Sequence, residues 1–105
     1  MLLTTTDAIA GREVVQVLGL VRGNSVRARA VHYDIWAGLK NLVGGEIDDY
    51  TKLLAESREQ ALDRMLDEGR ALGADAIVCV RFSTSSISRG AAELLAYGTA
   101  VRLAP

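Results

Sequence analysis

Few side chains in this sequence could bind a soft metal. The chain holds one histidine, His32, and one cysteine, Cys79. A soft metal prefers thiolates or several imidazoles at fixed spacing, so one chain supplies too few ligands. His32 and Asp34 could contribute two ligands, and symmetry could bring copies of them together on a ring axis. We favour a surface histidine before a helix cap, with no metal and no cofactor.

Gly44, Gly45 and Glu46 form the local motif most suggestive of ligand binding. Paired glycines let backbone N–H groups face a ligand just before a helix begins. The motif is not a P-loop, because no G-x-x-x-x-G-K-[ST] pattern occurs and the preceding residues have helical spacing. We therefore favour a turn between two helices, with at least one glycine at positive φ, over a cradle for an anion.

Arg27 and Arg29 could supply positive charge to an anionic ligand at a subunit junction. They alternate with alanines, which places both on one side of an extended segment. The alternative, which we favour, is an exposed edge strand protected by charge. The candidate ligand-binding residues are Arg27, Arg29, Asp34, Gly44, Gly45 and Glu46.

Catalysis has little basis in this sequence. One histidine, one cysteine and no grouping of Ser, His and Asp leave a nucleophile without its base. The acids Asp48 and Asp49 are explained by capping at a helix start. Cys79 fits a small, buried, apolar residue in a central strand. We therefore expect no enzyme.

The composition indicates a neutral domain with more apolar residues than usual. The chain has 105 residues and a net charge of -1, which argues against a protein that wraps duplex nucleic acid. Half of the residues are hydrophobic and ten more are glycine, which together exceed the usual share of about 45–50%. Such an excess favours association with other copies.

The sequence also predicts where the protein is located and how many domains it has. The N-terminus lacks the basic segment of a secretory signal, no apolar run is long enough to span a bilayer, and a single cysteine suits a reducing compartment. The length fits one domain. We expect a single cytoplasmic domain over residues 1–105, with no nucleic-acid partner and no membrane partner.

Hydrophobic periodicity and turn residues predict an α+β domain with a small antiparallel sheet packed on one long and one short helix. Gly73 supplies the left-handed residue that ends the long helix. The predicted elements are strands over 2–5, 13–21, 26–30, 76–84 and 94–103, helices over 34–43 and 50–72, a turn at 23–25 and a loop at 85–90.

The predicted strand over 13–21 is apolar on both faces. A single helical layer covers only one face of a sheet, so the other face is a candidate subunit interface. Regular alternation places Val15, Val17 and Val21 on one face and Val14, Leu18 and Leu20 on the other.

Two further faces follow from the same spacing. In the closing strand Ala96, Gly98 and Ala100 form a small-residue face that a neighbouring element can approach closely, opposite Leu95 and Val101. Trp36, Leu39 and Val43 recur at helical spacing and could stack on a planar ligand, although such a stripe more often faces a core. The predicted core stripe of the long helix is Tyr50, Leu53, Leu54, Ala61, Met65 and Leu72.

A set of short motifs, in order along nearly the whole chain, carries a resemblance to a known family. The motifs are Val26-Arg27-Ala28-Arg29, Asp34-Ile35, Leu39-Lys40-Asn41, Val43-Gly44-Gly45-Glu46, Tyr50-Thr51, Leu72-Gly73-Ala74-Asp75-Ala76, Val80-Arg81-Phe82 and Ala96-Tyr97-Gly98-Thr99-Ala100-Val101. Together they resemble the YbjQ-like bacterial proteins. The resemblance implies a subunit fold similar to dodecin, a closed ring of five subunits and no established activity, in a family labelled as heavy-metal-binding. It also implies a glycine at the position of Cys79.

Two functional hypotheses follow. The first is a non-enzymatic homo-oligomer, a pentamer by the resemblance, whose ligand sites lie at subunit junctions or on the ring axis. The alternative is a binding module for a metal ion or a small anion, which would use His32, Asp34 and Glu46 or the pair Arg27 and Arg29.

Overall fold

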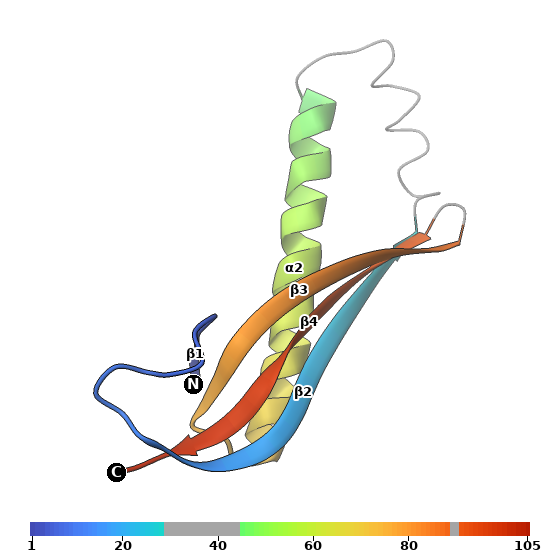
Figure 1. Ribbon diagram of the computed structural model, residues 1–105. Helices are drawn as coiled ribbons and strands as arrows, with labels where there is room; N and C mark the ends of the chain where they lie inside the picture. The colour runs from blue at the N-terminus through green and yellow to red at the C-terminus, as the bar shows by residue number, and fades with distance from the viewer. Residues whose placement is uncertain (29–44, 89–90) are drawn as a thin grey trace.

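A computed structural model describes residues 1–28, 45–88 and 91–105, and places the helix α2 against one face of a four-stranded sheet (Figure 1). The sheet order is β1-β3-β4-β2, with β4 antiparallel to β3 and β2, and β1 parallel to β3. The sheet is therefore mixed, and the expectation of a purely antiparallel sheet was wrong. The elements are β1 (Leu2–Leu3), β2 (Val14–Ala28), α2 (Gly45–Ala71), β3 (Ala76–Ser88) and β4 (Ala91–Leu103).

The strand β2 runs without a break through the segment predicted as a turn. Gly23, Asn24 and Ser25 pair with β4 in continuous register. Gly23 is needed for contact rather than for a turn, because a Cβ there would overlap the Ala61 carbonyl oxygen and the Met65 amide nitrogen of α2. A residue type that often forms turns, here Gly23, thus allows the strand and the helix to approach closely.

Two irregularities in β2 change which side chains share a face. The register with β4 shifts between Val14 and Gln16 and again between Val17 and Gly19. An extra residue in one strand reverses the alternation beyond it. Leu18 and Val21 therefore pack toward α2, while Val17 and Leu20 lie on the opposite face. The predicted grouping of Val17 with Val21 was wrong for this reason.

The helix α2 contacts the sheet along one row of residues spaced four apart. Ser57, Ala61, Met65 and Gly69 are all buried. Across from them Ala96, Gly98 and Ala100 of β4 are buried as well, which confirms the predicted small-residue face. The predicted helix stripe was only partly correct: Ala61 and Met65 are in the core, whereas Leu54 and Leu72 are each 45% exposed.

The C-terminal end of α2 was predicted correctly, but its N-terminal end was not. Gly73 follows the helix with φ of 76°, as expected for a left-handed stop. The helix begins at Gly45 rather than near residue 50, so Gly45 and Glu46 are helical and do not form the predicted turn. Asp48 and Asp49 lie within the first turns instead of capping the helix, where acids still suit the helix dipole. The predicted helix over 34–43 falls outside the described residues.

The strands β3 and β4 are longer than predicted. Residues 85–88, expected in a loop, continue β3, and β4 begins at Ala91. Ser85, Ser86 and Ser88 each pair with a residue of β4, and Ile87 lies at a register shift, so pairing with β4 extends the strand through this serine-rich segment.

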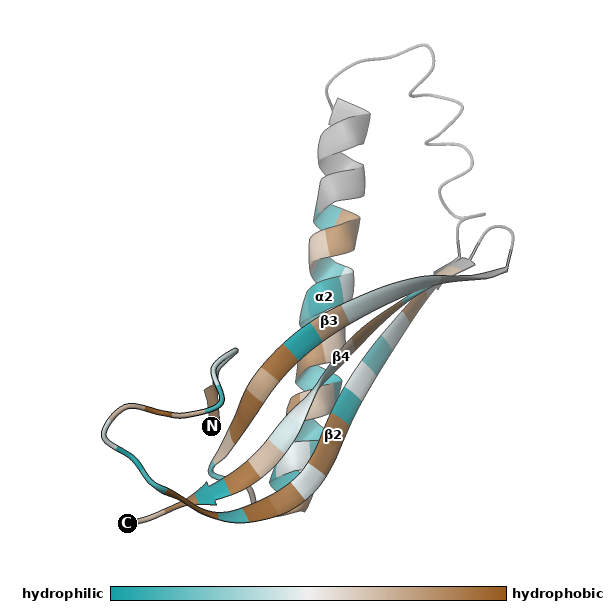
Figure 2. Cartoon of the chain, viewed as in Figure 1, coloured by the Kyte–Doolittle hydropathy of each residue, from teal (hydrophilic) through white to brown (hydrophobic). Residues whose placement is uncertain are grey.

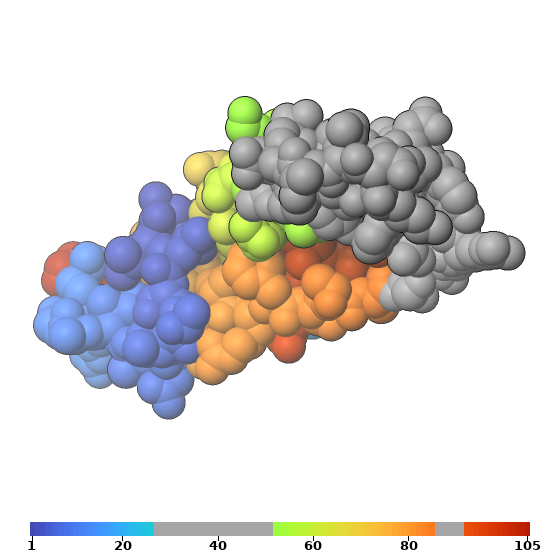
Figure 3. Space-filling model, turned by 90° about the horizontal axis from the view of Figure 1, so that it is seen from above, coloured from blue at the N-terminus to red at the C-terminus, as the bar shows by residue number. Residues whose placement is uncertain are grey.

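Within the described residues, the N-terminal segment covers one end of the sheet face away from α2. Ala76, Val78, Val101 and Leu103 form a second buried cluster, and the N-terminal segment packs Ile9 over it. Figure 3 shows this segment in dark blue beside the yellow-orange start of β3. The structure is long and thin, 57 × 25 × 18 Å, with a radius of gyration of 17.3 Å, where a compact domain of this length has about 13 Å.

Candidate functional site

The sequence-predicted site residues are only partly within the described residues. Arg29, His32, Asp34 and Gly44 lie outside them. Arg27 lies near the end of β2, and Gly45 and Glu46 lie in the first turn of α2, without described side chains. The hypotheses of an arginine pair and of a His32 metal ligand therefore stay predictions.

Metal ligands are sparse where the structure can be read. Within residues 1–28, 45–88 and 91–105, no three side chains of His, Cys, Asp or Glu gather in a way that could hold a metal ion. Cys79, the one cysteine of the chain, is partly exposed.

Cys79 has an unusual backbone for a strand residue. Its φ is 55°, in the left-handed region that favours glycine, and it lies where the register with β4 shifts between Val78 and Arg81. Its N–H donates to the Thr6 carbonyl at 3.0 Å, which ties the N-terminal segment to β3. The predicted place in a central strand is confirmed, because β3 lies between β1 and β4, but the predicted burial was wrong, because Cys79 is partly exposed at this register shift. A glycine at this position would adopt the same φ without strain.

Side chains of α2 occupy part of the free edge of β2. The backbone N–H of Arg22 donates to Glu68 Oε1 at 3.3 Å, and Arg64 donates to the Asn24 carbonyl. The contact at Gly23 brings helix and strand close enough for both bonds. These two groups of the edge strand are thus already engaged, and cannot pair with a further strand without a rearrangement.

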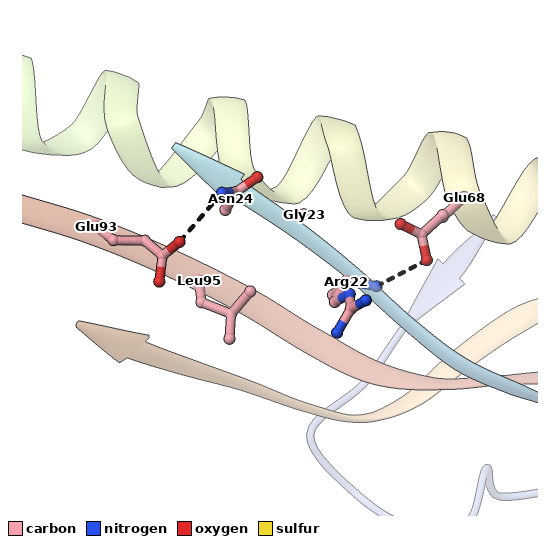
Figure 4. Close-up of a pocket in the computed structure, with 6 residues that line it drawn as sticks. All are labelled: Arg22, Gly23, Asn24, Glu68, Glu93 and Leu95. Carbon is pink, nitrogen blue, oxygen red and sulfur yellow. Dashed lines mark hydrogen bonds between the residues drawn. The ribbon is translucent and has the colours of Figure 1, made fainter. Parts of the chain in front are cut away.

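A polar cavity of about 360 Å³ opens beside this edge (Figure 4). Glu93 Oε2 accepts a hydrogen bond from Asn24 Nδ2 at 3.1 Å, so the Glu68 and Glu93 carboxylates are each held by β2 through one oxygen. Figure 4 shows the Arg22 side chain on the same side of β2 as Leu95. The lining residues are Arg22, Gly23, Asn24, Glu68, Glu93 and Leu95.

Local sequence patterns marked no residue of this cavity as a candidate ligand-binding residue. Arg22 and Glu68 are 46 positions apart, and Asn24 and Glu93 are 69 apart. Residues so far apart leave no common spacing in the sequence. Only Gly23, a glycine inside an apolar strand, carried a signal of close backbone approach.

The first half of β2 exposes an apolar row. Val15, Val17 and Leu20 are 57%, 66% and 63% exposed. The brown bands at the lower end of β2 in Figure 2 belong to this segment. We call these three residues the β2 row. It lies beyond the cover of α2, as expected for the second face of a two-layer domain.

A second apolar surface lies between α2 and β3. The helix packs mainly on β2 and β4. Ile77 and Val80 at the start of β3 lie in the core beneath it, whereas the later part of β3, beyond Val80, lies beside it. Figure 3 shows the orange atoms of β3 open to solvent beside the green atoms of α2. Leu54 and Phe82, both 45% exposed, line a cavity of about 400 Å³ there. We call it the α2–β3 groove; its lining residues are Leu54, Ser57, Arg58, Phe82, Thr84, Ala92, Glu93 and Leu94.

The family model described as "Putative heavy-metal-binding" matches residues 1–104. The chain belongs to the YbjQ family. Curated relatives of this YbjQ-family chain carry the name UPF0145 protein, which states no activity. The relative from Halorubrum lacusprofundi is 61% identical over 103 residues, 98% of this chain and 99% of the relative. The relative from Archaeoglobus fulgidus is 59% identical over 103 residues, 98% of this chain and 95% of the relative.

A solved structure shares the fold of this YbjQ-family chain. It is a crystal structure of a protein of unknown function from Pediococcus pentosaceus, assigned to the DUF74 family, with a TM-score of 0.66 and 18% identity. The match covers 99% of this chain and 98% of the other. Of the helices in the described residues, none is long and apolar enough to cross a membrane.

Proposed function

We propose that this protein acts as a homo-oligomer without enzymatic activity, a closed ring of five subunits whose ligand sites lie at the subunit junctions. The observation that carries the proposal is the solvent-exposed β2 row of Val15, Val17 and Leu20. A contiguous apolar row on a strand is unfavourable in water and marks an interaction surface.

The surface area supports association. The chain exposes 6823 Å², whereas a compact monomer of 11.2 kDa exposes about 5,700 Å². The excess is about 1,100 Å², which lies between the roughly 800 Å² that a subunit buries in one standard interface and the roughly 1,600 Å² that it buries in two. Packing against copies of itself would bury this excess surface of the elongated subunit.

The energy of covering the β2 row is large enough to matter. Complete burial of one valine or leucine side chain contributes about 1.5–3 kcal/mol. With about three fifths of each side chain exposed, covering Val15, Val17 and Leu20 contributes about 4 kcal/mol per junction. In a ring each subunit takes part in two junctions, so this contribution recurs around the assembly.

Native mass spectrometry and light scattering test the assembly. We expect one species of five times the 11.2 kDa chain mass at micromolar concentration. Val17→Asp should shift this species toward the monomer, while Leu72→Asp, which charges an exposed apolar site just after α2 and outside the β2 row, should not. A wild-type monomer at micromolar concentration would contradict the proposal.

A binding module for a metal ion or a small anion is the second candidate. The family description favours it, and its ligands would be His32, Asp34 and Glu46 or the pair Arg27 and Arg29. Elemental analysis and untargeted mass spectrometry of the purified protein separate the two candidates. A metal or metabolite present at one or more per ring, and lost in His32→Ala, would support the module; protein free of both would leave the assembly alone.

The proposal places the protein in the cytoplasm and assigns it no catalytic residue. The single cysteine suits a reducing compartment. The names of the relatives state no enzymatic activity. In the structure, the polar cavity of Arg22, Glu68 and Glu93 is the described site nearest the β2 row, and it would lie close to a junction formed there.

A further inference from the structure

Two apolar surfaces of this chain lie on opposite faces of the sheet. Leu20 of the β2 row pairs with Thr99 and Val17 with Val101, on the face away from α2. Phe82 of the α2–β3 groove pairs with Ala96, whose side chain is in the core under α2. One surface is a row of projecting side chains, and the other is a recess.

We propose that the β2 row of one subunit docks into the α2–β3 groove of the next. This inference rests on the proposed ring and adds to it the pair of surfaces that meet at each junction. The occupant of the groove is therefore a second copy of the chain, and the groove needs no separate partner.

The placement of the two surfaces favours this pairing over pairing of like surfaces. A dimer with twofold symmetry joins one surface to its own copy, whereas a closed ring of more than two subunits joins two different surfaces in head-to-tail order. Because the β2 row and the α2–β3 groove lie on opposite faces of one sheet, each subunit can bind one neighbour through each surface. Contact of β2 row with β2 row would stop at a dimer and leave the groove open.

The chemistry of the two surfaces is complementary. The β2 row consists of aliphatic side chains, and the groove offers Leu54, Phe82 and Leu94 to them. Two of the polar groups of the groove already have partners within the subunit. The Ser57 hydroxyl is buried and donates to Ser25 Oγ at 3.0 Å, and Glu93 accepts from Asn24. The volume of about 400 Å³ lies in the range that accommodates a bound organic group.

Thiol cross-linking tests the pairing directly. In a Cys79→Gly background, the double variant Val17→Cys with Leu54→Cys should give a ladder of covalent oligomers up to five with a short bismaleimide. Each single cysteine variant should give monomers only, because like surfaces do not meet. The matched control pairs Val17→Cys with Leu72→Cys, which has the exposure of Leu54 but lies outside the groove.

A charge pair gives a second readout that does not depend on cross-linking geometry. Val17→Asp disables the row and Phe82→Asp disables the groove, and both sites are exposed, so circular dichroism should show both variants folded. Each alone should fail to form a ring. Their mixture retains one intact row and one intact groove, and should form a dimer of the two variants that grows no further.

The outcomes separate this inference from the proposed ring. Cross-linking of the Val17→Cys variant with itself, or a full ring formed by Phe82→Asp, would overturn the pairing while the ring stands. A wild-type ring whose double cysteine variant gives no ladder above its Leu72 control would do the same. A wild-type monomer would overturn both.

Discussion

Replacing Cys79 by glycine and by alanine separates the strain of its backbone from the packing of its thiol. Both replacements remove the sulfur, but only glycine removes the Cβ that is crowded at φ of 55°. A left-handed conformation costs a residue with a Cβ about 1–2 kcal/mol. At an ordinary strand position the order is reversed, because glycine loses about 0.5–1 kcal/mol to alanine. We expect the glycine variant to be about 1 kcal/mol more stable than the alanine variant.

Urea denaturation followed by circular dichroism measures this difference. About 1 kcal/mol corresponds to a rise of roughly 4–8 °C in Tm for a domain of this size. The two variants must be compared at one protomer concentration, since association couples to stability. Val78 is the matched control: it is the preceding residue of β3, is buried, and has no positive φ, so Val78→Ala should be more stable than Val78→Gly. An alanine variant at position 79 as stable as the glycine variant, or more so, would refute the strain argument.

Three further predictions concern β2 and its packing against α2. Gly23→Ala should lower the free energy of unfolding by about 3 kcal/mol, because the added Cβ meets helix backbone that cannot move aside. Gly19 has a φ of 135° but no atom within 4 Å of an added Cβ, so Gly19→Ala should lower the free energy of unfolding by about 1 kcal/mol. Calorimetry of the two variants should show this order. Ser25→Ala and Ser57→Ala should each cost about 1–2 kcal/mol, and the double variant should cost less than their sum in a double-mutant cycle, because one buried hydrogen-bond network joins Ser25, Ser57 and Gln60. Glu68→Ala should speed amide exchange at Arg22, measured by hydrogen–deuterium exchange, and should change stability by less than about 1 kcal/mol; an unchanged exchange rate would show that the N–H is protected by another group.

The local pattern of the sequence was sufficient for several elements. The stop of α2 at Gly73 and the small face of Ala96 and Ala100 were predicted correctly. The central apolar run of β3 and the α+β class were predicted correctly as well. The family resemblance also proved correct. The structural predictions among these depend on residues that are neighbours in the chain or lie one helical turn or one strand repeat apart.

The face assignment of β2 shows where the local pattern fails. Alternation groups Val17 with Val21, but the register shift between Val17 and Gly19 places them on opposite faces. The position of a bulge is set by how the partner strand fits, and it leaves no signature in the strand's own alternation. The surface that carries the proposed function was therefore predicted to exist, but its members were identified only by the fold.

By itself the sequence determined the kinds of element, the long helix with its glycine stop and the excess of apolar residues, because these depend on composition and on short-range periodicity. Only the tertiary structure decided that β1 pairs in parallel with β3, that Gly23 touches the helix backbone, and that Arg22 and Glu68 line one cavity. It alone also separated the β2 row from the α2–β3 groove on opposite faces. These features join residues tens of positions apart, and their geometry follows from how whole elements pack rather than from any local spacing.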